Sequence, residues 1–188
     1  IKSKIDGNSR ISLSDDQLFD QSTANAGGLD STSGNTFVGY LAGQSVDAGS
    51  INNTFIGHGV GDATLADATS NVGLGAGALT ALTSGDENIA IGKDAGKALL
   101  AGAENTIVGT AAGDALTSGG GNVIIGDGAG GTTTDVDSAV IIGRSAAADG
   151  NMDSDADGTV LVGFEAGKAL TSGAGNTAIG YKALSTSV

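Results

Sequence analysis

The 188-residue chain contains no cysteine and no proline, it has a single histidine, and only 3% of its residues are aromatic. The lack of cysteine excludes a disulfide framework and a Cys-based metal site. No run approaches the roughly 18 consecutive apolar residues of a membrane-spanning helix, so we expect no membrane insertion. Cations are also scarce, with 8 Lys and Arg against 21 Asp and Glu. The resulting net charge of −13 argues against a nucleic-acid partner, because phosphates require cationic side chains.

Glycine, in contrast, is abundant, with 34 residues. Because proline is absent and the glycines do not recur at every third position, collagen is excluded. Hydrophobic residues make up 39% of the chain, which is too many for the usual disordered protein despite the net charge. The composition therefore indicates a folded protein that is rich in small side chains.

A five-residue motif, Asn-Thr/Val-x-Ile/Val-Gly with variants, occurs nine times. The intervals between its closing glycines are 18, 18, 17, 17, 17, 17, 20 and 17 residues. These corner glycines are Gly39, Gly57, Gly75, Gly92, Gly109, Gly126, Gly143, Gly163 and Gly180. Self-similarity at a nearly fixed period is typical of repeat proteins. We therefore assign residues 34–188 to one repeat array and residues 1–33 to an N-terminal connecting or capping segment, and we expect the natural chain to be longer.

Seventeen residues are too few for two helices and a turn, and the repeats are rich in glycine and β-branched residues, which favour strands and tight turns. The sequence predicts an all-β fold, a parallel β-solenoid (β-roll or β-helix) of about nine coils. At about 4.8 Å per coil, the rod would be about 43 Å long. We expect the recurrent asparagine to form a stacked ladder whose amides bond the backbone of the next coil. Its members are Asn35, Asn53, Asn71, Asn88, Asn105, Asn122 and Asn176.

Each predicted strand is apolar on both faces. The residue before the corner glycine is Val, Ile or Leu in every repeat, and the residue before that one is never polar. Successive residues of a strand point to opposite faces, so one row fills the core and the other forms an apolar stripe along the rod. We place the second row, which includes Ile124, in the stripe and expect copies of the same chain to cover it as a homotrimer. Coverage by residues 1–33 is the alternative.

The segments GNTFVGYLAG, ENTIVGTAAGDALTSG and GNTAIGYKALSTS resemble the Gly/Asn-rich repeats of bacteriophage tail-fibre and receptor-binding proteins. They are also similar to the β-roll head repeats of trimeric autotransporter adhesins, although the period here is longer, which favours the phage side. The resemblance implies a trimeric, extracellular fibre on the virion tail or, alternatively, on a bacterial cell surface. It implies two kinds of partner besides the chain itself: other fibre or virion proteins, and a glycan or receptor on the host surface.

The sequence offers little for catalysis. The one histidine, His58, follows a corner glycine, where its side chain is predicted to point outward, and no cysteine nucleophile exists. Gly126, Gly128 and Gly131 spell a dinucleotide-binding pattern, but no helix is predicted after them and the same corner recurs in every repeat. We expect no enzymatic activity. A tailspike glycosidase, which needs paired carboxylates, and an ice-binding solenoid, which needs an unbroken Thr-x-Thr array, are the alternatives.

Aromatic side chains follow the corner glycine in neighbouring repeats at both ends of the array. Tyr40 and His58 form one pair, and Phe164 and Tyr181 form the other. Exposed aromatic pairs can stack on sugar rings, so these four residues are candidate glycan contacts. The alternative is a stabilising side-chain ladder without a ligand.

The one 20-residue interval contains a run of alternating aspartates, Asp153, Asp155 and Asp157, followed by Gly158. This spacing matches the opening of a calcium-binding loop, in which alternate carboxylates converge on the ion. The closing carboxylate of such a loop is missing. We predict a Ca²⁺ site with Asp153, Asp155 and Asp157 as side-chain ligands and the carbonyl of Thr159 as a further ligand; a solvated acidic loop is the alternative.

Overall fold

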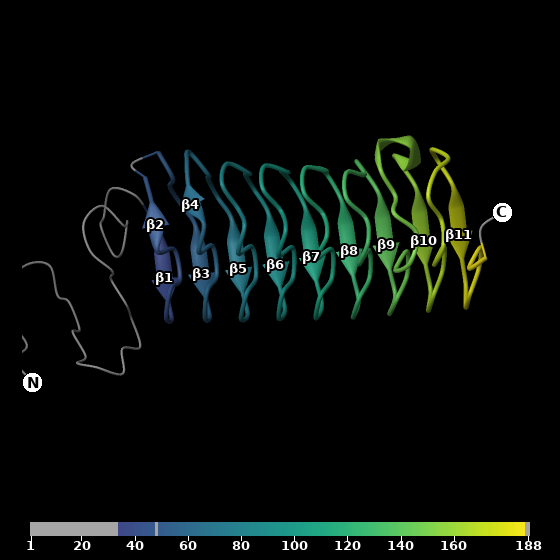
Figure 1. Ribbon diagram of the computed structural model, residues 1–188, viewed down its shortest axis with the longest axis horizontal. Coiled ribbons are helices and arrows are strands. Elements are labelled where there is room, and N and C mark those ends of the chain that lie inside the picture. Colours follow the sequence, from purple (N-terminus) through teal and green to yellow (C-terminus); the bar gives the residue numbers. More distant parts are fainter. Residues whose placement is uncertain (1–33, 48, 187–188) are drawn as a thin grey trace, which may run out of the picture.

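The chain winds into a rod of stacked coils (Figure 1) in the computed structural model, which describes residues 34–47 and 49–186. One strand from each repeat joins a nine-stranded sheet in the order β1-β3-β5-β6-β7-β8-β9-β10-β11, and all its pairings are parallel. These strands are β1 (Thr36–Val38), β3 (Thr54–Ile56), β5 (Val72–Leu74), β6 (Ile89–Ile91), β7 (Thr106–Val108), β8 (Val123–Ile125), β9 (Val140–Ile142), β10 (Val160–Val162) and β11 (Thr177–Ile179). The predicted parallel β-solenoid is confirmed. The role predicted for residues 1–33 lies outside the described residues.

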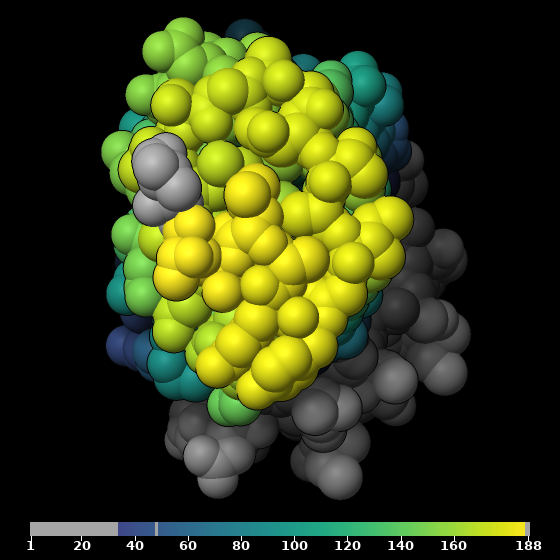
Figure 2. All heavy atoms as spheres, turned by 90° about the vertical axis from the view of Figure 1, so that its right-hand side faces the viewer, coloured from purple at the N-terminus to yellow at the C-terminus, as the bar shows by residue number. Residues whose placement is uncertain are grey.

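Every coil is in register with the next one. Ile107 of β7 pairs with Ile124 of β8, which in turn pairs with Ile141 of β9. Equivalent residues therefore form straight columns along the rod. Viewed along its length, the stacked coils superimpose into a compact cross-section (Figure 2).

The middle residue of each strand points into the coil, and these nine residues form the inner column of the core. They are Phe37, Phe55, Gly73, Ala90, Ile107, Ile124, Ile141, Leu161 and Ala178, and all are buried. The prediction that Ile124 lies in the apolar stripe is wrong, because its side chain is fully buried inside its own coil. The flanking residues of each three-residue strand point outward instead.

Core volume is kept nearly constant by compensation within a coil. Gly73 takes the inner position beside Phe55, and a Cβ atom there would lie 2.5 Å from Val60 and 3.1 Å from Phe55. The same coil has a fully buried Leu79 at a position where its neighbour has Gly61. The larger side chain restores the volume lost at Gly73, as close packing requires.

A corner that is followed by another coil requires glycine for two reasons, which Gly109 illustrates. Its φ of 138° lies in a region that side-chain-bearing residues rarely adopt. A Cβ atom would also lie 2.5 Å from the carbonyl oxygen of Gly126, the corner glycine of the next coil. The close stacking of the coils therefore excludes a side chain at this position.

A buried asparagine ladder closes and joins the coils, as predicted for Asn35, Asn53, Asn71, Asn88, Asn105 and Asn122. The prediction is wrong for Asn176, which is only partly buried and whose amide donates to the carbonyl of Gly173. The Nδ2 atom of Asn105 donates to the carbonyl oxygen of Gly119, 2.9 Å away in its own coil, and to Oδ1 of Asn88 at 2.9 Å. Its Oδ1 atom accepts from the backbone N–H of Asn122, 3.1 Å away, and from the Asn122 amide. Each asparagine thus replaces part of the hydrogen bonding that a strand would supply.

Two local features depart from the 17-residue coil. The first two coils are longer and carry a second small parallel sheet of β2 (Ser45–Val46) and β4 (Thr64–Leu65). The 20-residue coil contains the short 3₁₀ helix η1 (Ser154–Ala156), which places Ala156 in the core together with Met152. The extra residues are therefore accommodated without breaking the main sheet.

Candidate functional site

An uncharged surface runs along the rod on the outward side of the nine-stranded sheet. It consists of the first and last residue of each strand, and we call it the outer face. The last residues are Val38, Ile56, Leu74, Ile91, Val108, Ile125, Ile142, Val162 and Ile179, and the first are Thr36, Thr54, Val72, Ile89, Thr106, Val123, Val140, Val160 and Thr177. None of the eighteen is charged and none is fully buried. The predicted apolar stripe therefore exists, but it is the column of last residues and not the column that contains Ile124.

Several side chains of the outer face are well exposed for their type. Leu74 is 42% exposed, Ile89 is 39% exposed and Ile179 is 68% exposed. The protein has a net charge of −13, yet this face carries no charge. Large exposed apolar patches mark interaction surfaces. The outer face is thus the leading candidate for a functional surface.

The residues that follow the corner glycines form a second column at one edge of this face. Tyr40 stacks on the exposed His58 with ring centroids 5.4 Å apart, so the prediction that His58 points outward is confirmed. At the other end, Phe164 and Tyr181 stack at 5.4 Å with an interplanar angle of 13°. The guanidinium of Arg144 lies 4.8 Å from the centre of the Phe164 ring.

This stacking limits what the aromatic pairs can bind. Phe164 has Arg144 and Tyr181 as ring partners in the coils on either side. Sugar binding by stacking needs a free ring face, and in each pair one face of each ring is covered by its partner. Glycan contact by Tyr40, His58, Phe164 and Tyr181 stays a prediction, and the ladder geometry supplies the stabilising contact that was its alternative.

The proposed calcium ligands lie around η1. Asp153 Oδ1 caps this 3₁₀ turn by accepting from the backbone N–H of Asp155 at 3.0 Å. Asp157 Oδ1 accepts from the backbone N–H of Asp137 in the preceding coil at 2.8 Å. Thr159 is fully buried, its carbonyl oxygen accepts from the backbone N–H of Val140 at 2.9 Å, and its Oγ1 has no hydrogen-bond partner. Two of the three carboxylates are thus already engaged by backbone donors, and Ca²⁺ binding at these residues stays a prediction.

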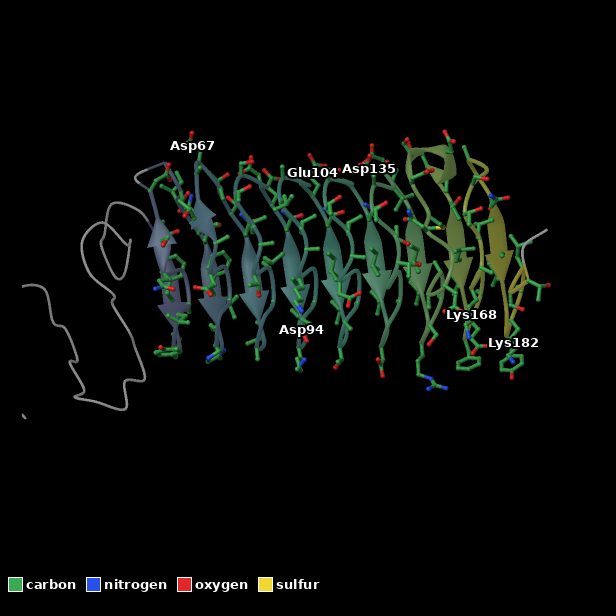
Figure 3. All side chains as sticks on the ribbon, in the orientation of Figure 1. Asp67, Asp94, Glu104, Asp135, Lys168 and Lys182 are labelled. Carbon is green, nitrogen blue, oxygen red and sulfur yellow. The ribbon has the colours of Figure 1, made fainter. Side chains whose placement is uncertain are left out.

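Carboxylates line the edge of the rod opposite the corners, where Asp67, Glu104 and Asp135 are seen in Figure 3. Some of them join adjacent coils through backbone N–H groups: Asp86 Oδ1 accepts from Thr69 at 2.7 Å, and Asp137 Oδ1 accepts from Gly120. Charge-assisted hydrogen bonds of this kind are stronger than neutral ones. These aspartates therefore have a structural role that the sequence pattern did not reveal.

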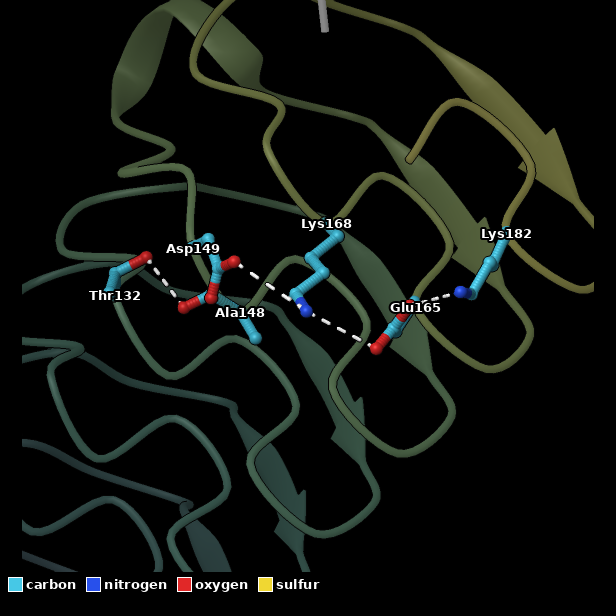
Figure 4. Close-up of polar contacts among 6 residues, drawn as sticks. All are labelled: Thr132, Ala148, Asp149, Glu165, Lys168 and Lys182. Atoms are coloured by element: carbon cyan, nitrogen blue, oxygen red, sulfur yellow. Dashed lines mark hydrogen bonds and ion pairs between the residues drawn. The ribbon is translucent and has the colours of Figure 1, made fainter. Parts of the chain in front are cut away.

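An ion-pair network joins the last coils (Figure 4). Lys168 Nζ lies 3.2 Å from Glu165 Oε1 and 3.6 Å from Asp149, while Lys182 Nζ lies 3.3 Å from Glu165 Oε2. The hydrogen bond from Lys168 lowers the pKa of Glu165, and the same carboxylate raises the pKa of both lysines. These charges are satisfied by one another.

Within residues 34–47 and 49–186 no three His, Asp or Glu side chains are grouped so as to hold a metal ion. The same residues contain no helix that is long and apolar enough to cross a membrane. Comparisons with protein-family profiles, curated proteins and solved structures gave no match. The observations on function therefore consist of the uncharged outer face and the rod of stacked strands.

Proposed function

We propose that the chain is a structural and adhesive segment of an extracellular fibre, in which the solenoid serves as a stiff shaft or as part of a receptor-binding region. The observation that carries this proposal is the unbroken, in-register stack of nine parallel strands. At about 4.8 Å per strand it spans about 43 Å, and successive coils are tied together by buried amide hydrogen bonds. Such a stack transmits force along its length through many parallel hydrogen bonds.

The fibre is proposed to be a homotrimer that belongs to a phage tail, with a bacterial surface adhesin as the alternative. Support for self-association comes from the uncharged outer face. Support for the fibre class comes from the Gly/Asn-rich repeat, which both kinds of surface protein share. The proposed outside partners are other fibre or virion proteins and a host-surface glycan or receptor.

Negative-stain electron microscopy of the purified 188-residue chain tests the shape, and rods rather than globules are expected. Binding of the labelled protein to a panel of bacterial cells, with and without periodate oxidation of their surface glycans, tests adhesion. Globular particles, or intact rods that bind no cell of the panel, would count against an adhesive fibre. Release of oligosaccharides from the cells would replace the proposal with a tailspike glycosidase, and inhibition of ice growth would replace it with an ice-binding protein.

A further inference from the structure

All the lysine and arginine side chains that the structure describes lie at one edge of the rod, together with the aromatic rings outside the core. We call it the corner edge, and it consists of the five residues after each corner glycine. Figure 3 shows Lys168 and Lys182 at this edge and Glu104 at the opposite one. The other segments of the described coils carry Asp and Glu but neither Lys nor Arg. On a rod with a net charge of −13, the corner edge is therefore where an anionic group can be attracted.

The repeats differ from one another at the corner edge. The residue directly after the corner glycine is, from coil to coil, Tyr, His, Ala, Lys, Thr, Asp, Arg, Phe and Tyr, whereas the glycine before it never changes. The coils stack with any of these side chains, so the fold does not dictate them. Side chains that a repeat scaffold does not need for its own packing are available for binding.

Arg144 is a cation of this edge that no carboxylate neutralises. Its side chain is exposed, and its guanidinium forms no ion pair with any carboxylate of the described residues, whereas Lys168 and Lys182 both pair with Glu165. The guanidinium lies 4.8 Å from the centre of the Phe164 ring, and this stacking holds it in place. Lys182 Nζ lies 6.0 Å from the centre of the same ring. The five N–H donors of a guanidinium form a rigid fork that binds two oxygen atoms of a carboxylate or phosphate group.

The carboxylates nearest in the coil stack leave Arg144 available. Glu165 belongs to the next coil, where its backbone N–H donates to the carbonyl oxygen of Arg144 at 3.1 Å. Its carboxylate is compensated by Lys168 at 3.2 Å and Lys182 at 3.3 Å. Asp127, the residue equivalent to Arg144 in the preceding coil, is the one acidic residue directly after a corner glycine, and it opposes an anion at this place.

We propose that Arg144, with Lys182 near the same ring, binds the phosphate or carboxylate group of an acidic sugar. The side chain of Tyr181, which is 74% exposed and stacks on Phe164, gives the sugar an amphipathic surface next to the bound group. A single anionic group fits this site, whereas a dense polyanion such as a nucleic acid is repelled by the acidic remainder of the rod. The proposal rests on the adhesive function proposed above and gives the host-surface glycan its chemical class.

Titration of the full chain with glucose 6-phosphate, glucuronic acid, glucose and inorganic phosphate tests the ligand class by nuclear magnetic resonance. An acidic sugar should bind with a Kd on the order of 1 mM and shift the signal of the Arg144 side-chain N–H, and glucose should not bind. The tighter of the two acids tells a phosphate ligand from a carboxylate ligand. If neither acid binds, or if glucose or inorganic phosphate binds as tightly as the acidic sugars, the inference is overturned.

Matched charge variants test the residue at physiological ionic strength. Arg144→Gln should weaken binding by about 10-fold or more, because charge-assisted hydrogen bonds are lost. Lys97→Gln removes the same charge from an exposed cation that stacks on no described ring, three coils or about 14 Å along the rod, and should change the affinity by less than about twofold. Asp127→Asn should strengthen binding by about twofold, because it removes the opposing charge.

All three variants change exposed side chains, so circular dichroism should be unchanged. Equal losses for Arg144→Gln and Lys97→Gln would refute the site, since they would reflect net charge alone. Wild-type rods that bind cells but neither acidic sugar would overturn the inference and leave the proposed fibre standing. A chain that binds an acidic sugar through Arg144 but binds no cell would keep the site and count against adhesion.

Discussion

Residues 71–138 and residues 139–186 build the same solenoid with different bonds. The first region has four coils of 17 residues, each beginning at a fully buried asparagine of the ladder. In the second region Ala139 and Thr159 occupy the ladder positions, and the next asparagine, Asn176, is only partly buried. The backbone N–H of Ala139 still donates to Oδ1 of Asn122 at 2.8 Å, but the ladder ends there.

The second region is joined by contacts nearer the surface. Asp157 accepts from the backbone of Asp137, Glu165 pairs with Lys168 and Lys182, and Arg144 covers the ring of Phe164. Buried hydrogen bonds are insensitive to salt, whereas exposed ion pairs are screened and contribute little. The comparison teaches that the solenoid tolerates the loss of the ladder where surface contacts between coils replace it.

The largest effect is expected at the corner glycines, where the two regions offer a matched pair. Gly109→Ala should destabilise the protein by about 3 kcal/mol or more, because the φ of 138° is unfavourable and the new methyl would clash with Gly126. Gly180 has a φ of 129°, but a methyl group added there would meet no atom within 4 Å, so Gly180→Ala should cost about 1–2 kcal/mol. Urea denaturation followed by circular dichroism measures both. Equal losses would show that backbone strain alone makes these positions glycine.

Breaking the ladder inside the regular region should have the next largest effect. Asn105→Ala removes hydrogen bonds to Gly119, Asn88 and Asn122 and leaves buried backbone groups without partners. We expect a loss of about 3 kcal/mol in the free energy of unfolding, since unsatisfied buried groups are costly. Asn176→Ala, at a partly buried asparagine outside the ladder whose amide donates to the nearby carbonyl of Gly173, is the control and should lose about 1 kcal/mol. If Asn105→Ala were as mild as this control, the ladder would not be the main support of the regular coils.

The fold and its axial repeat could be predicted from the sequence because the repeat itself encodes them. The corner glycine, the asparagine and the strand between them recur at fixed spacing, and spacing is what sets the register of a solenoid. The direction of each side chain could not be predicted in the same way. Ile124 and Ile125 are both isoleucine, and with apolar residues on both faces the alternation gives no sign of which one is buried.

The existence of an apolar stripe was therefore predicted, but the stripe was assigned to the residue before the correct one, to Ile124 and not to Ile125. The direction of the middle residue of β8 depends on where the chain turns between strands. Some of these turns use a positive φ at residues other than glycine, such as Glu87 and Ala111, so the sequence does not mark them. The hydrogen bonds of Asp157 were also beyond sequence reasoning, because its partner Asp137 belongs to the preceding coil. Isolated aspartates are equally consistent with calcium ligands and with coil-to-coil bonding.

A smaller effect, of opposite sign, is expected where the irregular region buries a hydroxyl without a partner. Thr159→Val keeps the shape of the side chain and removes the partnerless Oγ1, so it should raise the stability by about 1 kcal/mol. Thr80 in the regular region donates to the carbonyl of Gly77 at 2.7 Å, and Thr80→Val should lose about 1 kcal/mol. Thermal unfolding of the two variants should therefore move in opposite directions, and a lower midpoint for Thr159→Val would indicate that its hydroxyl is satisfied in solution.

The smallest effect concerns the surface charges that join the last coils. Hydrogen bonds and charge from Lys168 and Lys182 lower the pKa of Glu165 from its ordinary value of 4.5. A carboxyl with a lowered folded-state pKa contributes stability that is present above the unfolded-state pKa and is lost as the pH falls through the folded-state pKa. Glu165→Gln should therefore lower the unfolding midpoint slightly at neutral pH and low salt, and the difference from the wild type should vanish in acid and at high salt. Asp135→Asn, a change at an exposed carboxylate outside this network, is the control. If the unfolding midpoint of Glu165→Gln stayed below that of the wild type in acid, the side chain would act through packing. Residues 139–186 would then not differ from residues 71–138 in their sensitivity to salt.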